Sequence, residues 1–119
     1  MFKIFVIIQR KDKEGKIVIV SEEGIKVNGE KYSLLNLHAL EAWNMGYVKV
    51  KYGRSEEIVP LGKIVFRFKD GGELSIEALN PIDLTDRLVI WLNNIHRSNN
   101  EPIFIQKDLS GEHVSYSRE

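Results

Sequence analysis

The stretch Asn80-Pro-Ile-Asp-Leu-Thr-Asp-Arg-Leu-Val-Ile-Trp-Leu-Asn-Asn-Ile-His-Arg97 predicts a helix more clearly than any other part of this sequence. Asn80 suits an N-cap because its side-chain oxygen can accept from the N–H groups of the first turn, and Pro81 suits the first helical position. The large apolar residues recur at spacings of three and four, which places them in one stripe on a helix. That stripe consists of Leu84, Leu88, Trp91, Leu92 and Ile95.

Short strands are expected before this helix. The clearest candidates are apolar, β-branched or alternating segments at residues 2–10, 17–20, 48–52, 64–68 and 74–78. Residues 32–43 fit a helix spacing about as well as a strand, and we interpret them as mainly strand because turns bound them closely. We expect turns at residues 28–29, 44–46, 53–55 and 70–72. Residues 56–61 are predicted to form a short edge strand broken at Pro60.

A lone amphipathic helix after a run of strands must bury its stripe against a sheet or plug a barrel. Some seven or eight strands at roughly even spacing, followed by one helix, are typical of a small barrel or sandwich with a helix at its end. The sequence therefore predicts a mainly β fold with one C-terminal α-helix.

The order of elements and the helix sequence resemble the pleckstrin-homology-like (PH-like) superfamily, in its prokaryotic form. Trp91, Leu92 and Ile95 match the tryptophan and aliphatic spacing of the helix in that family, and residues 15–27 resemble its second and third strands. The resemblance implies a bent antiparallel barrel of seven or so strands, capped at one open end by the helix. It implies a domain over residues 1–97, with residues 80–97 as the capping helix and the apolar stripe as its plug.

Residues 98–119 are expected to form a C-terminal extension to this domain. Ile103, Phe104 and Ile105 follow a polar loop and predict a short strand at residues 102–105, and residues 106–119 are expected to be a mobile tail. The short strand would either fold back onto its own barrel or pair with the strand edge of a second copy or of a protein partner.

Composition narrows the class of protein. The chain has no cysteine, so it has neither disulfides nor thiolate chemistry, and we expect a cytoplasmic setting. Its 17 Lys and Arg balance 17 Asp and Glu, which disfavours sequence-independent binding to nucleic acid. No apolar run is long enough to span a bilayer, and we expect no signal peptide. Abundant Lys, Glu and Ile lean toward a thermophilic source.

Motifs for enzymatic chemistry are absent from the sequence. His38, His96 and His113 are scattered without metal-ligand spacing, and neither a nucleophile elbow nor a phosphate-binding loop is present. We therefore expect no catalytic residue, no metal site and no cofactor.

The most consistent interpretation is a non-enzymatic PH-like module that binds another protein as an adaptor. An alternative is a membrane-surface module, because the family binds anionic lipid through the loop after its first strand, which here contains Arg10, Lys11, Lys13 and Lys16. The interleaved Asp12 and Glu14 disfavour lipid binding. Further alternatives are a small enzyme, or a nucleic-acid binder that uses the cation and aromatic mixture of residues 49–54.

Overall fold

The structure is a computed structural model that describes the backbone of residues 2–6, 16–27 and 29–118, and the side chains of residues 18–27 and 29–118. One α-helix, α1 (Pro81–Ser98), and one 3₁₀ turn, η1 (Leu34–Asn36), lie in these ranges. The strands there are β1 (Phe2–Val6), β2 (Lys16–Ser21), β3 (Gly24–Val27), β4 (Glu30–Tyr32), β5 (Leu37–Tyr52), β6 (Ser55–Phe68), β7 (Glu73–Leu79), β8 (Phe104–Leu109) and β9 (His113–Arg118).

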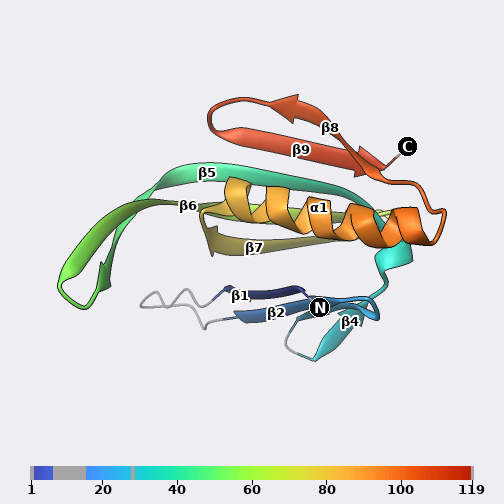
Figure 1. The fold of residues 1–119 in the computed structure, drawn as a ribbon, viewed down its shortest axis with the longest axis horizontal. Helices are drawn as coiled ribbons and strands as arrows, with labels where there is room; N and C mark the ends of the chain where they lie inside the picture. The colour runs from blue at the N-terminus through green and yellow to red at the C-terminus, as the bar shows by residue number, and fades with distance from the viewer. Residues whose placement is uncertain (1, 7–15, 28, 119) are drawn as a thin grey trace.

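The strands form two antiparallel sheets, ordered β1-β2-β3-β4 and β7-β6-β5-β9-β8 (Figure 1). Strand β1 lies beside β7, but no hydrogen-bonded ladder joins them. The predicted mainly β class with one helix is therefore confirmed. The expected bent barrel is corrected to two separate antiparallel sheets, because the neighbouring edges β1 and β7 approach without pairing.

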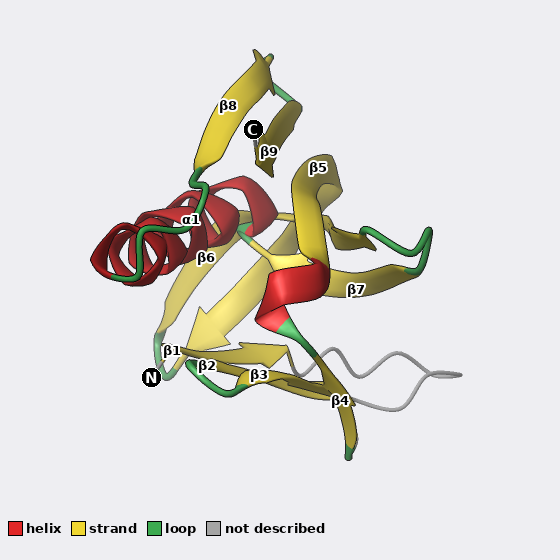
Figure 2. Ribbon diagram, turned by 90° about the vertical axis from the view of Figure 1, so that its right-hand side faces the viewer, coloured by secondary structure: helices red, strands yellow, loops and turns green. Residues whose placement is uncertain are grey.

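Helix α1 lies along the inner face of the five-stranded sheet, against β5, β6 and β9, and the four-stranded sheet lies below them in both views (Figures 1 and 2). The core lies where these three layers meet. Its side chains come from all of them, and include Val18, Val20, Ile25, Leu37, Leu40, Ile64, Phe66, Ile76, Leu88 and Leu92.

The buried face of α1 differs from the predicted stripe. Leu88 and Leu92 are fully buried, whereas Leu84, Trp91 and Ile95 are only half-buried. The face also contains the buried polar residues Thr85 and His96. A prediction based on apolar residues alone includes neither Thr85 nor His96. The buried face was therefore predicted too far toward Trp91.

The start of α1 also differs from the prediction. Asn80 occupies the left-handed region, with φ 49° and ψ 52°, and its side chain makes no capping hydrogen bond. Its backbone is held instead: its carbonyl accepts from Leu84 N at 2.9 Å, and its N–H donates to the carbonyl of Pro60 at 2.9 Å. Asparagine suits this position because it tolerates positive φ better than other non-glycine residues.

The helix is followed by a β-hairpin, so the expectation of a mobile tail is corrected. Strands β8 and β9 pair with each other, and β9 pairs with β5 from Ala39 to Trp43. The strand begins at Phe104, two residues later than predicted, and continues to Leu109. The second half of this strand is exposed to solvent on both faces. Its sequence therefore lacks the alternation of apolar and polar residues from which a strand is predicted.

Two expected interruptions are absent from the five-stranded sheet. Residues 44–46 form a β-bulge inside β5 and no turn, and residues 56–61 belong to the continuous strand β6. For residues 32–43 the strand interpretation holds from Leu37 onward, after the η1 turn.

Candidate interaction surface on the β5–β6 arm

Strands β5 and β6 extend far beyond their neighbours and form a two-stranded arm (residues 44–60) that projects from the body (Figure 1). Pairing of β9 with β5 stops at Trp43, and pairing of β7 with β6 stops at Leu61. Between Gly46 and Val59, no described residue outside β5 and β6 forms a ladder with the two strands, which pair with each other. The molecule is correspondingly elongated, with principal extents of 47 × 33 × 25 Å.

Local sequence explains why the arm forms and bends. Val48, Val50 and Tyr52 alternate with Lys49 and Lys51, which is the period of a strand. At the tip, Gly53 has φ 62° and begins a two-residue turn, as tight hairpins require.

The bend at the base of the arm comes from the bulge between Asn44 and Gly46. Opposite it, Gly62 approaches the backbone so closely that a Cβ there would lie 1.7 Å from the carbonyl oxygen of Trp43. The bulge therefore depends on glycine at position 62.

The direction of the backbone groups along the arm follows from one contact. The carbonyl of Pro60 accepts from Asn80 N, on the side away from β5. In an antiparallel ladder the N–H and C=O of one residue point to the same side, so Pro60 does not bond to Tyr47, the residue it faces. Tyr47 therefore directs its own N–H and C=O away from β6, and with a period of two Lys49 and Lys51 do the same. These three residues define the outer β5 edge.

The backbone groups of the outer β5 edge have no partner strand among the described residues. Beyond Trp43, no described strand pairs with this side of β5. A row of free N–H and C=O groups is a template for an added strand. The opposite edge of the arm, on β6, is interrupted by Pro60, which has no N–H to donate.

Large apolar side chains on the arm are exposed. Tyr47, Ile58 and Met45 are 62%, 69% and 71% exposed, and Tyr52 at the tip is also exposed. Tyr47 and Ile58 lie on the same face of the ribbon. Ile58 is paired with the residue two positions after Tyr47, and directly paired residues point to the same face of a sheet. Such a gathering of apolar groups beside an open edge is typical of an interaction surface.

A pocket of ≈ 320 Å³ lies at the base of the arm, next to the start of α1. Its carboxylates are already engaged: Asp83 forms an ion pair with Arg87, and Asp86 accepts a hydrogen bond from the hydroxyl of Tyr116. Burial, together with this hydrogen bond, raises the pKa of Tyr116 to about 12. The hydrogen bond between Tyr116 and Asp86 thus joins the C-terminal hairpin to the helix.

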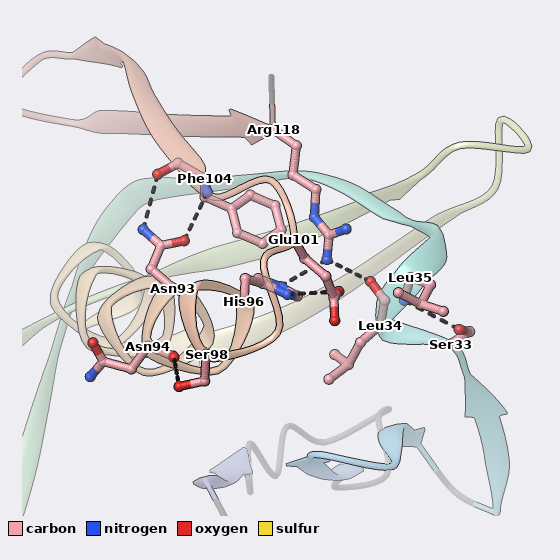
Figure 3. A network of polar contacts seen from close by, with 10 residues as sticks. All are labelled: Ser33, Leu34, Leu35, Asn93, Asn94, His96, Ser98, Glu101, Phe104 and Arg118. Atoms are coloured by element: carbon pink, nitrogen blue, oxygen red, sulfur yellow. Dashed lines mark hydrogen bonds and ion pairs between the residues drawn. The ribbon is translucent and has the colours of Figure 1, made fainter.

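The other end of that hairpin is fixed by a buried polar cluster (Figure 3). Arg118 donates through Nη2 to His96 Nε2 at 2.8 Å and to the carbonyl of Leu34 at 2.9 Å. Glu101 Oε2 lies 3.2 Å from His96 Nδ1. Burial, and then the charge of Arg118, lower the pKa of His96.

The predicted partner strand lies at this end of the hairpin. The side chain of Asn93 bonds both backbone groups of Phe104, accepting from its N–H at 2.8 Å and donating to its carbonyl at 3.0 Å. Phe104 is buried, Ile103 and Ile105 are half-buried, and β8 pairs with β9 of the same chain. Of the two alternatives for this segment, the structure therefore has the one in which it folds back onto its own sheet.

The predicted lipid-binding loop is not assembled into a site by the described residues. Arg10, Lys11 and Lys13 lie outside them, and Lys16 is described only as the first backbone position of β2. The described residues hold no group of three or more acidic, His or Cys side chains arranged for a metal ion. Among the helices described, none is long and apolar enough to cross a membrane.

Comparisons of the chain with protein-family models, with curated proteins and with solved structures each gave no match. Its function is therefore inferred from its own residues and geometry.

The arm edge was not identified from the sequence, although part of its signal was visible. The alternation over residues 48–52 correctly indicated a strand with one wet face. Residues 44–46 and Pro60 were interpreted as interruptions. The sequence therefore did not predict that β5 and β6 are continuous strands that are longer than their neighbours. The length of neighbouring strands is a tertiary property, so an unpaired edge cannot be located without the sheet order.

Proposed function

We propose that this chain is a non-enzymatic PH-like interaction module that binds a protein partner. Seven strands precede the helix, and the helix packs on the inner face of the five-stranded sheet. Strand β1 of the four-stranded sheet lies beside β7. This arrangement supports the resemblance, with the arm and the β8–β9 hairpin as additions to the family's pattern. Fold likeness supplies a class of activity only, so the mode of binding rests on the arm.

The proposed mode is addition of a partner's strand to the outer β5 edge. The observation that carries it is the outward direction of the N–H and C=O groups of Tyr47, Lys49 and Lys51 on a projecting ribbon. In strand addition the backbone hydrogen bonds provide affinity, and alternate side chains provide specificity.

The other described strand edges are less suited to this role. Strand β4 has only three residues, β7 has β1 beside it, and β8 contains a bulge between Gln106 and Asp108. Short edge strands, bulges and prolines are the usual protections against pairing with another chain. The β6 edge of the arm contains Pro60. Of the long edges described, the outer β5 edge is therefore the one whose backbone has neither a proline nor a bulge.

Selection from a displayed library of random peptides tests this mode with matched variants. Lys49→Pro removes an outward N–H and leaves the β5–β6 ladder bonds intact, and Ile58→Pro does the same on the β6 edge. We expect selected peptides to bind the wild-type protein and Ile58→Pro, and to lose binding to Lys49→Pro. Circular dichroism would establish that both variants stay folded.

Failure to select any peptide would contradict strand addition by the arm. Equal binding of the selected peptides to Lys49→Pro and to the wild-type protein would contradict it as well. Loss of binding in Ile58→Pro alone would move the site to the opposite edge.

A further inference from the structure

We propose that the segment added to the outer β5 edge is a strand in which acidic residues alternate with apolar ones. This inference rests on the proposed function of strand addition and identifies the chemistry of the partner. It follows from the two faces of the arm, which differ in character.

The first face of the arm presents cationic side chains beside the open edge. Tyr47, Lys49 and Lys51 share this face, and both lysines are exposed. The residue across from Lys49 on β6 is the apolar Ile58, and Lys51 Nζ lies 3.7 Å from Glu56 Oε1 in an exposed ion pair. An added strand would place its own residues opposite these lysines, where carboxylates are attracted and cations repelled.

The second face of the arm is apolar along β5. Val48 and Val50 are half-buried, and Val59, across from Val48, is buried. Residues of an added strand that point to this face would extend an apolar surface. Because successive side chains of a strand point to opposite faces, one partner strand can satisfy both faces only by alternating acidic and apolar residues.

The protein already contains one pairing of this kind. Strand β7 alternates acidic or polar residues with apolar ones, and it pairs with the basic positions of β6 in the registers Lys63↔Glu77 and Arg67↔Glu73. Arg67 Nη1 lies 2.7 Å from Glu73 Oε2, while Ile76 and Ala78 point into the core. The same complementarity would operate on the outer β5 edge.

A second copy of the chain is a poorer occupant of this edge. Two β5 edges related by a twofold axis pair residues of the same face, so registers centred on Lys49 or on Val50 place lysine opposite lysine. Like charges directly opposite each other destabilise a sheet, and edge lysines commonly prevent self-pairing.

Fluorescence anisotropy with labelled synthetic peptides tests the partner's chemistry. Three capped peptides of equal length would alternate valine with glutamate, with serine or with lysine. We expect the glutamate peptide to bind wild-type protein most tightly and the lysine peptide most weakly. The double variant Lys49→Glu/Lys51→Glu should weaken binding of the glutamate peptide by about tenfold or more and should bind the lysine peptide better than wild type does.

The controls separate this inference from the proposed function. Lys26→Glu, at an exposed lysine on the other sheet, should leave all three affinities unchanged. If the serine and glutamate peptides bind equally and Lys49→Pro abolishes both, strand addition holds and the acidic partner is wrong. If none of the peptides binds, or if sedimentation shows that the arm pairs with a second copy, the acidic partner is wrong as well.

Discussion

Arg118 Nη2 donates to His96 Nε2 across 2.8 Å between two nearly inaccessible side chains, which are 7% and 1% exposed. Arginine carries only donors, so His96 Nε2 must be the acceptor and the ring proton lies on Nδ1, where Glu101 accepts it. His96 is therefore neutral in this arrangement. The contact joins the last strand of the chain to the last turn of the helix.

Removing Arg118 should destabilise the fold, because the hairpin and helix are linked through it. Arg118→Ala leaves His96 Nε2 and the carbonyl of Leu34 without this donor, at about 1–3 kcal/mol for each buried group left unpaired. Urea unfolding would measure the loss. Lys107→Ala, at an exposed position on the same hairpin, should stay within about 0.5 kcal/mol of wild type.

His96 should make stability fall in mild acid. Burial and the charge of Arg118 lower its pKa in the folded state, while in the unfolded chain it titrates near ~6.5. Between these two pKa values the unfolded state binds the extra proton, so stability is lost as the pH falls below about 6.5. The slope from this group cannot exceed about 1.4 kcal/mol per pH unit.

The control for this pH dependence is His96→Gln, which keeps a side-chain acceptor but does not titrate. Its unfolding free energy, measured from pH 7 downward, should lack the component that starts near ~6.5. Parallel curves for the variant and the wild type would show that His96 does not contribute.

Within the predicted plug, Leu92 should contribute more to the free energy of unfolding than the half-buried Trp91. Leu92 is fully buried, and Leu92→Ala should cost about 2–5 kcal/mol. Ile90, on the opposite side of the helix, is 64% exposed, and Ile90→Ala should cost less than about 1 kcal/mol. Equal losses in thermal unfolding would contradict the observed burial of Leu92 and exposure of Ile90.

The bulge at the base of the arm gives a paired glycine test. Gly62→Ala would force its Cβ against the carbonyl of Trp43, and we expect a loss of about 1–3 kcal/mol or more. Gly46→Ala meets nothing within 4 Å and has no positive φ, so it should be nearly neutral or slightly stabilising. Similar stabilities for both variants would contradict the close approach at Gly62.

Local patterns predicted most of the elements but not their boundaries within the sheet. The helix, the hairpin turns at Gly53 and Gly71, and the strand alternation near Ile64 and Ile76 follow from residue spacing and turn chemistry. The start of β8 was predicted, but the rest of β8 and the whole of β9 were not, because most of their side chains are polar and half-buried or exposed. The stability of this hairpin comes from pairing with β5 and from the Arg118 cluster, which are contacts across many residues of sequence.

The interaction surface depends even more on tertiary structure. In the sequence alone, Pro60 indicated a break in a strand, yet β6 continues through it. An N–H at this position would point beyond the end of β7, so the proline costs the ladder no hydrogen bond. Lys49 and Lys51 were visible as a wet face, which is equally true of any soluble strand. Only the sheet order shows that the edge beside them has no described neighbour.

The central claim, that Tyr47, Lys49 and Lys51 offer an open strand edge, is tested most directly by amide hydrogen exchange followed by NMR, before and after addition of the alternating glutamate peptide. In the free protein we expect fast exchange at these three amides and slower exchange at Val48 and Val50, whose N–H groups bond to β6. Addition of the peptide should slow exchange at Tyr47, Lys49 and Lys51 selectively. Protection of all five amides in the free protein, or binding of the peptide without any slowing at those three, would contradict the claim.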